Sequence, residues 1–202
     1  MVRVFLAGED AVACNLAVKI VRSSGLEVEF DRPLNVGGCG NFLKKMSALN
    51  EIARNVVPVL AIADGDQDPC LLRQLEAWRP ENMSERLIMR LAYRECESWL
   101  LADAEGLASF LQVNIGAIPR EPDLLSDPKR SMLGVIKRSG SRVLREEMLP
   151  AKGKSSPVGL GYNLHLEDFV RNCWKYERAA ARSPSLARIM PRLHGVLGNL
   201  EG

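Results

Sequence analysis

A run of apolar residues at positions 56–63, Val-Val-Pro-Val-Leu-Ala-Ile-Ala, restricts the fold of this chain more than any other feature. It leads directly into the acidic segment Asp64-Gly65-Asp66-Gln67-Asp68. A strand without polar positions has both faces covered, as strands in the middle of a parallel sheet do. Acids directly after such a strand lie at the carboxyl edge of the sheet, where open α/β folds bind ligands. The run therefore predicts a central strand with a site at its end.

Strand-like and helix-like patterns alternate over the first half of the chain. The expected strands are residues 2–7, 26–30, 56–63 and 86–92, and the expected helices are residues 11–21, 41–55, 68–78 and 94–111. This alternation is typical of a doubly wound α/β domain with a mostly parallel sheet. We expect that domain to cover residues 1–118.

The remaining residues, 119–202, show no further strand pattern and predict a helical extension. Helices are expected over residues 128–147, 166–181 and 186–197, and the Gly, Pro, Ser and Lys content of residues 151–162 predicts a mobile loop. Tryptophans 78, 99 and 174 fall at helical apolar spacings and are expected in the core rather than as platforms for stacking bases.

A second acidic cluster follows the first expected strand, where Gly8 precedes Glu9 and Asp10. Glu9 and Asp64 should therefore meet at the same edge of the sheet, with Asp66 and Asp68 as further ligands. Converging carboxylates repel one another unless a hard cation neutralises them, which predicts a Mg²⁺ or Mn²⁺ site. The alternative is an acidic turn in which Asp68 caps the following helix.

Two more acids, Glu95 and Glu97, begin the helix expected after the strand at residues 86–92. At 100° per residue, Glu97 falls within the apolar stripe of that helix, whereas Glu95, Trp99 and Asp103 share another side. A carboxylate in line with core positions is costly unless it is paired or bound to metal. Glu97 and then Glu95 are therefore the next candidate metal ligands, and Glu97 is also a candidate catalytic residue.

The chain has a net charge of only +2, but the charge is unevenly distributed. Residues 1–119 carry 12 Lys and Arg against 16 Asp and Glu, whereas residues 120–202 carry 15 against 9. A basic rear half suits binding to the phosphates of a nucleic acid, and a solvated basic surface is the alternative. The candidate nucleic-acid-binding residues are Lys129, Arg130, Lys137, Arg138, Lys152 and Lys154.

The acidic positions together resemble a Toprim-type domain. The resemblance rests on Gly8-Glu9, on Asp64-x-Asp66, and on Glu95-x-Glu97-x-Trp99-Leu-Leu-Ala-Asp103, and it covers roughly residues 1–111. Within that class, the chain is similar to the small stand-alone Toprim-like proteins of prokaryotes and to the nuclease half of the OLD family.

The Toprim resemblance implies an open, mostly parallel four-stranded sheet with Mg²⁺ held by the acids at the strand ends. By the same resemblance, Glu9 acts as general acid and base, Asp64 and Asp66 bind metal, and Glu97 supports a second metal. Lys129 and Lys154 are the candidates for stabilising the transition-state charge, with Lys129 preferred as a catalytic residue. The resemblance also implies an ATPase partner protein and a phage-defence or mobile-element setting.

The sequence thus leaves three functions open. The first is a Mg²⁺-dependent nuclease that hydrolyses phosphodiester bonds. The second is a non-catalytic interaction or regulatory subunit on a degenerate or nucleotide-binding Toprim fold, and the third is a primase-like nucleotidyl transferase. A carboxyl edge plugged by the chain's own side chains would favour the second.

Several features of the sequence exclude other classes of protein and other kinds of site. No apolar run approaches the roughly 20 residues that span a bilayer, and the apolar start is too short for a signal peptide, so we expect a cytoplasmic protein without membrane contact. Five dispersed cysteines and two isolated histidines do not form a zinc motif or a disulfide framework. The segment Gly37-Gly38-Cys39-Gly40 is expected as a flexible turn rather than a phosphate loop, because it lacks the Lys-Ser/Thr of a P-loop.

Overall fold

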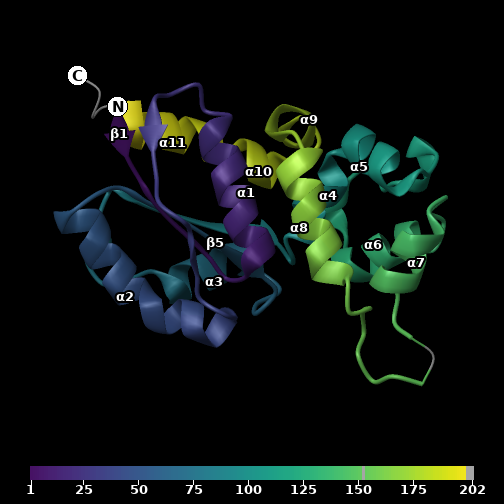
Figure 1. Cartoon of the computed structure of the whole chain (residues 1–202). Helices are drawn as coiled ribbons and strands as arrows, with labels where there is room; N and C mark the ends of the chain where they lie inside the picture. Colours follow the sequence, from purple (N-terminus) through teal and green to yellow (C-terminus); the bar gives the residue numbers. More distant parts are fainter. Residues whose placement is uncertain (152, 199–202) are drawn as a thin grey trace.

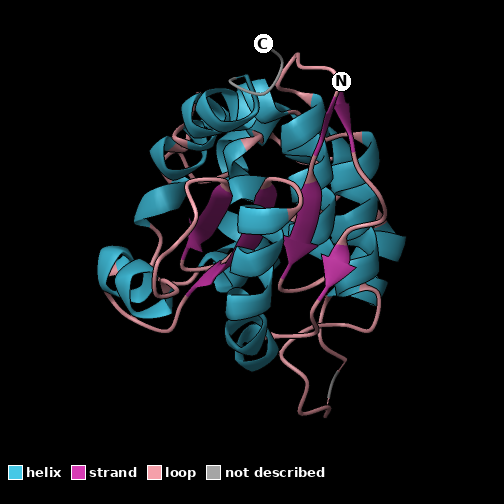
Figure 2. Ribbon diagram, turned by 90° about the vertical axis from the view of Figure 1, so that its left-hand side faces the viewer, coloured by secondary structure: helices cyan, strands magenta, loops and turns pink. Residues whose placement is uncertain are grey.

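The computed structural model describes residues 1–151 and 153–198. A four-stranded parallel sheet lies at the centre, with its strands in the order β4-β2-β5-β6. These strands are β2 (Phe5–Gly8), β4 (Leu34–Asn35), β5 (Val59–Gly65) and β6 (Leu87–Tyr93). Helices cover the sheet on both faces (Figure 2). The predicted α/β class, with a four-stranded sheet and a helical C-terminal region, is confirmed.

The central strand β5 is covered on both faces, as its apolar sequence predicts. Val59, Ala61 and Ala63 face the helices α2 (Cys39–Asn55) and α3 (Leu71–Trp78). Leu60 and Ile62 face a larger core that contains α1 (Ala11–Arg22) and the C-terminal helices. The alternation of side chains along a strand assigns successive residues to these two cores. The molecule therefore has three layers, with the sheet in the middle (Figure 1).

All four expected strands have different bounds in the structure. The strand expected at residues 26–30 is only β3 (Val28–Glu29), which lies outside the four-stranded sheet, and β4 takes the fourth place in that sheet. The strand expected at residues 56–63 begins only after Pro58 and continues to Gly65, so Asp64 belongs to the strand itself. The strand expected at residues 2–7 is split into β1 (Val2–Arg3), which pairs with β3 (Val28–Glu29), and β2. The split occurs because Val4 N donates to Glu29 O, whereas Phe5 N donates to Pro58 O. The chain thus changes its neighbour between these two residues.

The long helix expected over residues 94–111 is two helices, α4 (Glu97–Ala102) and α5 (Ala104–Leu111). Asp103 interrupts the helix because its carboxylate accepts a hydrogen bond from Gly106 N at 3.0 Å and forms an ion pair with Arg178 at 2.7 Å. Asp103 and Trp99 are fully buried. The side of the helix opposite to the predicted stripe is therefore also covered, by residues more than 70 positions away.

The C-terminal region consists of short helices rather than the three long helices expected. Its main helices are α6 (Pro128–Ile136), α7 (Arg142–Met148), α8 (Tyr162–Asn172), α9 (Tyr176–Ala180), α10 (Pro184–Ala187) and α11 (Ile189–Leu197), and two 3₁₀ turns, Ile115–Ala117 and Pro122–Leu124, precede them. Ser141 and Ser183 start α7 and α10 by accepting hydrogen bonds from the backbone of the first turn. Helix α8 packs on α1 (Figure 1). Helix α11 packs on β6.

One continuous core joins the sheet to the C-terminal helices and contains residues from Val2 to Leu197. Trp99 and Trp174 lie in this core and Trp78 in the core on the other face, which confirms that the tryptophans are structural. The division of the chain at residue 118 stays a prediction. None of the helices in the described ranges is both long and apolar enough to traverse a bilayer.

Gly65 separates the two aspartates at the end of β5 for a steric reason. A Cβ at this position would lie 2.5 Å from Ala92 O and 2.2 Å from Leu71 Cδ1. We therefore expect Gly65→Ala to lower the free energy of unfolding by about 1–3 kcal/mol, measured by urea denaturation. Gly134→Ala in α6 is the matched control, because a Cβ there would meet no atom of the described residues within 4 Å. This substitution should be neutral or stabilising. Equal effects of the two substitutions would contradict the steric explanation.

Candidate functional site

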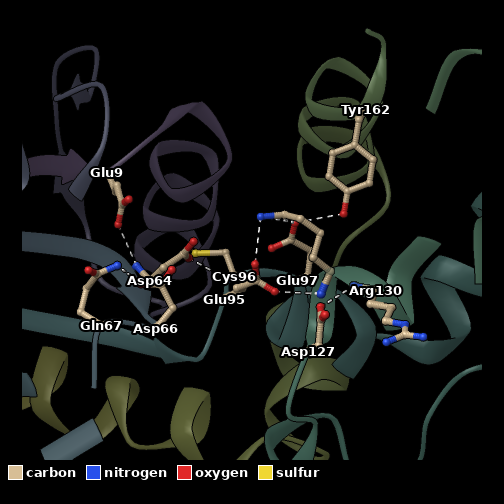
Figure 3. A network of polar contacts seen from close by, with 11 residues as sticks. Glu9, Asp64, Asp66, Gln67, Glu95, Cys96, Glu97, Asp127, Arg130 and Tyr162 are labelled. Carbon is tan, nitrogen blue, oxygen red and sulfur yellow. Dashed lines mark hydrogen bonds and ion pairs between the residues drawn. The ribbon is translucent and has the colours of Figure 1, made fainter. Parts of the chain in front are cut away.

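Glu9 and Asp64 lie side by side at the carboxyl edge of the sheet (Figure 3). Gly8 ends β2 so close to α1 that a Cβ would lie 2.5 Å from Cys14 N. Glu9 then continues the pairing with β5, since Glu9 N donates to Ile62 O at 2.9 Å. The Glu9 carboxylate accepts a hydrogen bond from Asp64 N at 3.1 Å. The predicted convergence of these two strand ends is therefore present.

The Asp64 carboxyl group has no cationic partner among the described residues. Its Oδ1 accepts a hydrogen bond from Cys96 N at 2.8 Å, in the turn that follows β6. Burial and the charge of Glu97, with a smaller contribution from Glu9, raise the pKa of Asp64 to about 8. Burial also raises the pKa of Glu9, and the charge of Asp66 adds to this effect. The site thus has an excess of negative charge.

The other two aspartates of the segment after β5 have different roles. Asp66 is exposed and accepts a hydrogen bond from the neighbouring Gln67 side chain at 2.6 Å. Asp68 accepts a hydrogen bond from Cys70 N at 2.6 Å and forms an ion pair with Arg73 at 2.9 Å. Asp68 therefore stabilises the turn before α3. It does not cap that helix, as the alternative to metal binding had it, because the N-cap residue is Cys70 and no side chain caps the first turn in the described ranges.

Glu95 and Glu97 form the second half of the acidic edge, and Lys129 lies against both. Lys129 Nζ is 2.9 Å from Glu95 Oε1 and 3.6 Å from Glu97 Oε1. The backbone N–H of Lys129 also donates to Glu95 Oε2 at 2.9 Å, since this residue lies in the first turn of α6. Glu97 is 6% exposed, as its place in the apolar stripe predicts, and Tyr162 of α8 donates its hydroxyl hydrogen to Glu97 Oε1 at 3.0 Å.

The pKa values in this half of the site follow from burial and charge. Burial raises the pKa of Glu97, although Lys129 opposes the rise. Burial would lower the pKa of Lys129, but the charges of Glu97 and Glu95 outweigh it and raise that pKa. The charge of Glu97 acts on Asp64 as well, so the two halves of the edge form one electrostatic unit.

An open cleft of about 500 Å³ adjoins this edge, lined by Asp66, Arg94, Glu95, Asp127, Lys129 and Arg130 among others. Arg94 has a φ of 65°, a left-handed conformation that is uncommon for residues other than glycine. It lies in the turn between β6 and α4. Arg94 thus supplies a cationic side chain to the cleft from the same turn as Glu95.

Arg94 and Tyr162 are functional candidates that the sequence alone did not predict. Arg94 directly precedes Glu95, and its position next to a strand end was the available signal. No signal in the sequence pointed to Tyr162, because Glu97, which it contacts, is 65 positions away.

The candidate nucleic-acid-binding residues do not form one group. Lys129 is half-buried and engaged by Glu95, and Arg130 lines the cleft, while Lys137 and Arg138 are exposed beyond the other end of α6. Lys154 lines a different pocket, with Glu146 and Glu147. Lys152 lies outside the described residues. Of the two candidates for transition-state stabilisation, only Lys129 lies in the acidic site.

The glycine segment before α2 closes over Glu9. Gly37 and Gly38 have φ angles of 74° and 108°, and Gly38 N donates to Glu9 O at 2.9 Å. Helix α2 begins at Cys39, whose N–H contributes to lowering the pKa of Glu9. Of the segment 37–40 expected as a turn, only Gly37 and Gly38 form it, because Cys39 and Gly40 already belong to α2. This turn brings the start of α2 to Glu9 at the acidic edge.

A divalent cation fits this edge by its donor chemistry, because Mg²⁺ and Mn²⁺ prefer carboxylate oxygens. Burial, together with the charge of neighbouring acids, raises the pKa of Glu9 and of Asp64, so each carboxyl group favours a proton or a cation over the bare charged form. As the side chains lie, however, no three Asp, Glu, His or Cys residues within 1–151 and 153–198 form a ready metal-binding group. A cation here therefore requires a side-chain movement, most simply of the exposed Asp66.

Comparison with family models, with curated proteins and with solved structures found no match for this chain.

Proposed function

We propose that this protein is a Mg²⁺- or Mn²⁺-dependent phosphodiesterase that acts on nucleic acid. The observation that carries the proposal is the placement of two acids at the strand ends: the Glu9 carboxylate accepts a hydrogen bond from the backbone N–H of Asp64, and the charge of Glu9 helps to raise the pKa of Asp64. Neither carboxyl group has a cationic partner within 4.0 Å in the described part of the chain. Such a pair is stable in its charged form when a divalent cation neutralises it. The Toprim-like arrangement of the acids supports the same reaction class.

The side chains take distinct roles in this proposal. Glu9, Asp64 and Asp66 would hold the cation, which would supply a Lewis acid to polarise the phosphodiester and to lower the pKa of a water nucleophile. Lys129 occupies the place between Glu95 and Glu97 where a second cation would bind, and its ammonium group supplies fixed positive charge instead. Arg94 and Arg130, from the walls of the cleft, hold the phosphate backbone. Glu9 is then positioned to accept the proton of the attacking water.

A second candidate is a non-catalytic interaction subunit. It is favoured by the contacts of Lys129 and Tyr162, which plug the half of the edge around Glu95 and Glu97, and by the lack of a ready metal group among the described residues. In that case the same edge binds a cation weakly or not at all. Nucleotidyl transfer, the third function that the sequence leaves open, requires the same cation and differs in its product.

The first test is incubation of wild-type protein with plasmid and with single-stranded DNA, in the presence of Mg²⁺, Mn²⁺ or EDTA. We expect cleavage that depends on the metal and is lost in Glu9→Gln. Asp31→Asn is the matched control, because Asp31 is an exposed acid that pairs with Arg3 away from the site. DNA that is extended rather than cut would indicate the transferase.

An ATPase partner, implied by the Toprim resemblance, is the component to add if wild type binds Mg²⁺ without cleaving. If neither the metal response nor cleavage occurs with or without such a partner, the phosphodiesterase proposal is refuted in favour of the interaction subunit.

A further inference from the structure

A second pocket, away from the acidic edge, lies at the outer edge of the sheet beside β6. Its volume is about 320 Å³, within the size range of small-ligand sites. Three arginines line it: Arg79 just after α3, Arg90 in β6 and Arg192 in α11. None of the acids of the candidate active site belongs to its lining.

Arg90 is the unusual member of this group. Among residues 1–151 and 153–198, its buried Nε has no hydrogen-bond partner, and its Nη1 donates only to the backbone carbonyl of Met89 at 3.0 Å. Burial lowers the pKa of Arg90, and the positive charge of Arg192 lowers it further. Burying part of a guanidinium group costs free energy when one of its N–H donors lacks an acceptor and another positive charge lies nearby. A bound anion would offset that cost.

The chain itself does not supply that anion in the described ranges. Glu76 and Glu85 line the pocket, but neither forms an ion pair within 4.0 Å of any of the three arginines. Arg192 is instead held by the backbone, since its Nη2 donates to Glu85 O at 2.6 Å. Two guanidinium groups are thus oriented by carbonyl groups while part of their donor set stays available.

The opposite wall of the pocket is apolar. It is formed by Leu72 and Leu75 of α3 together with Met83 and Met89. Leu72 is 66% exposed, so part of this apolar surface faces solvent. The pocket therefore combines a cationic side with an apolar side. These two sides suit a ligand that has an anionic group at one end and a less polar group at the other.

We propose that this pocket binds the phosphate monoester of a nucleotide, with the phosphate on Arg90 and Arg192 and the nucleoside against the apolar wall. A guanidinium fork matches the oxygens of a phosphate group in geometry and charge. The phosphate belongs to either a free mononucleotide or the 5′ end of a nucleic acid strand. The site is independent of the phosphodiesterase proposal, because it shares no residue with the acidic edge.

The test is isothermal titration of wild-type protein with inorganic phosphate, with AMP, and with a short oligonucleotide with or without a 5′-phosphate. We expect saturable binding of AMP, tighter than that of phosphate alone. Tighter binding of the 5′-phosphorylated oligonucleotide than of AMP would assign the site to strand ends, and the reverse order would assign it to free nucleotides. Absence of saturable binding of any phosphorylated probe would overturn the proposal.

Substitution of the arginines tests whether they hold the phosphate. Arg90→Gln and Arg192→Gln should each weaken AMP binding at least about tenfold, since each removes charge-assisted hydrogen bonds. Arg192 is exposed, so its variant tests the site even if Arg90→Gln folds poorly. Arg86→Gln is the matched control, because Arg86 Nε is also buried without a partner but the residue lies outside the pocket.

Wild-type affinity in both Arg90→Gln and Arg192→Gln would mean that Arg90 only covers the edge of β6, and it would overturn the proposal. Asp64→Asn should leave AMP binding unchanged. Unchanged AMP binding in this variant would separate the pocket from the acidic edge, whatever the outcome of the cleavage assay. Loss of AMP binding in this variant would place the ligand at the acidic edge and overturn the proposal.

Discussion

Metal-free Asp64→Asn protein is expected to match wild type in stability at pH 4 and to exceed it at pH 8. The pKa of Asp64 is raised from 3.8 to about 8 in the folded state. Between these values the folded protein retains a proton that the unfolded chain releases, so wild-type stability falls as the pH rises through this window. Asparagine cannot ionise, and its side-chain oxygen still accepts the hydrogen bond from Cys96 N. We expect a gain of at least about 2 kcal/mol at pH 8.

The same substitution should remove the response to Mg²⁺. A cation bound at the proposed site would replace the proton on Asp64 in wild type, so millimolar Mg²⁺ should raise the melting temperature at pH 8 and less at pH 5. Asp64→Asn should gain nothing from the metal. Any metal-dependent cleavage should fall at least about a hundredfold, because a metal-polarised phosphate contributes several kcal/mol to the transition state.

Urea unfolding at pH 4, 6 and 8, with and without Mg²⁺, measures both effects in one protein. Asp31→Asn serves as the control, since it removes one exposed charge and should follow wild type at every pH. Two results would contradict this prediction: Asp64→Asn is less stable than wild type at pH 8, or Mg²⁺ stabilises Asp64→Asn as strongly as it stabilises wild type. Either would mean that the carboxylate is satisfied without a cation.

The part of the site that the sequence predicts is the part that depends on local pattern. Glu9 and Asp64 meet because each follows or ends an apolar strand, and parallel strands share a carboxyl edge. Glu97 is buried because it lies in the apolar stripe of its own helix. These positions follow from the periods of strands and helices, which are properties of a few adjacent residues.

The features that the sequence did not predict depend on contacts between residues far apart in the chain. Asp103 divides a helix that its apolar stripe predicts to be continuous, because it pairs with Arg178. The strand β4 contains only two residues and exists through its pairing with β2, where Leu34 lies beside Ala7. Tyr162 reaches Glu97 from a separate helix. No local pattern encodes such contacts, so they required the folded structure.

The contact of Lys129 with Glu95 and Glu97 gives the second large prediction. Replacing the half-buried ammonium group by the apolar side chain in Lys129→Met leaves two carboxyl groups that repel each other. Breaking a fully buried ion pair in this way costs about 3–5 kcal/mol, and partial exposure of Lys129 to solvent reduces that cost. We expect a loss of about 1–3 kcal/mol at pH 8, measured by urea unfolding.

The loss should be smaller at pH 5. Lys129 is the main influence that lowers the pKa of Glu97 against the effect of burial, so its removal raises that pKa further. A carboxyl group with a raised pKa in the folded state contributes stability at low pH and loses it as the pH rises. The protonated form of Glu97 should therefore relieve the repulsion in acid, and Mn²⁺ or Mg²⁺ should relieve it at pH 8 by taking the place of the ammonium group.

Two further variants distinguish charge from packing in this prediction. Lys137→Met is the matched control, because Lys137 is exposed just after the same helix and should change stability by less than about 0.5 kcal/mol. Lys129→Met combined with Glu97→Gln should recover most of the lost stability at pH 8, since the repulsion is then removed from both sides. If Lys129→Met loses the same free energy at pH 5 and pH 8, and the second substitution recovers none of it, then Lys129 contributes through the packing of its aliphatic chain. In that case it does not stand in for a second cation.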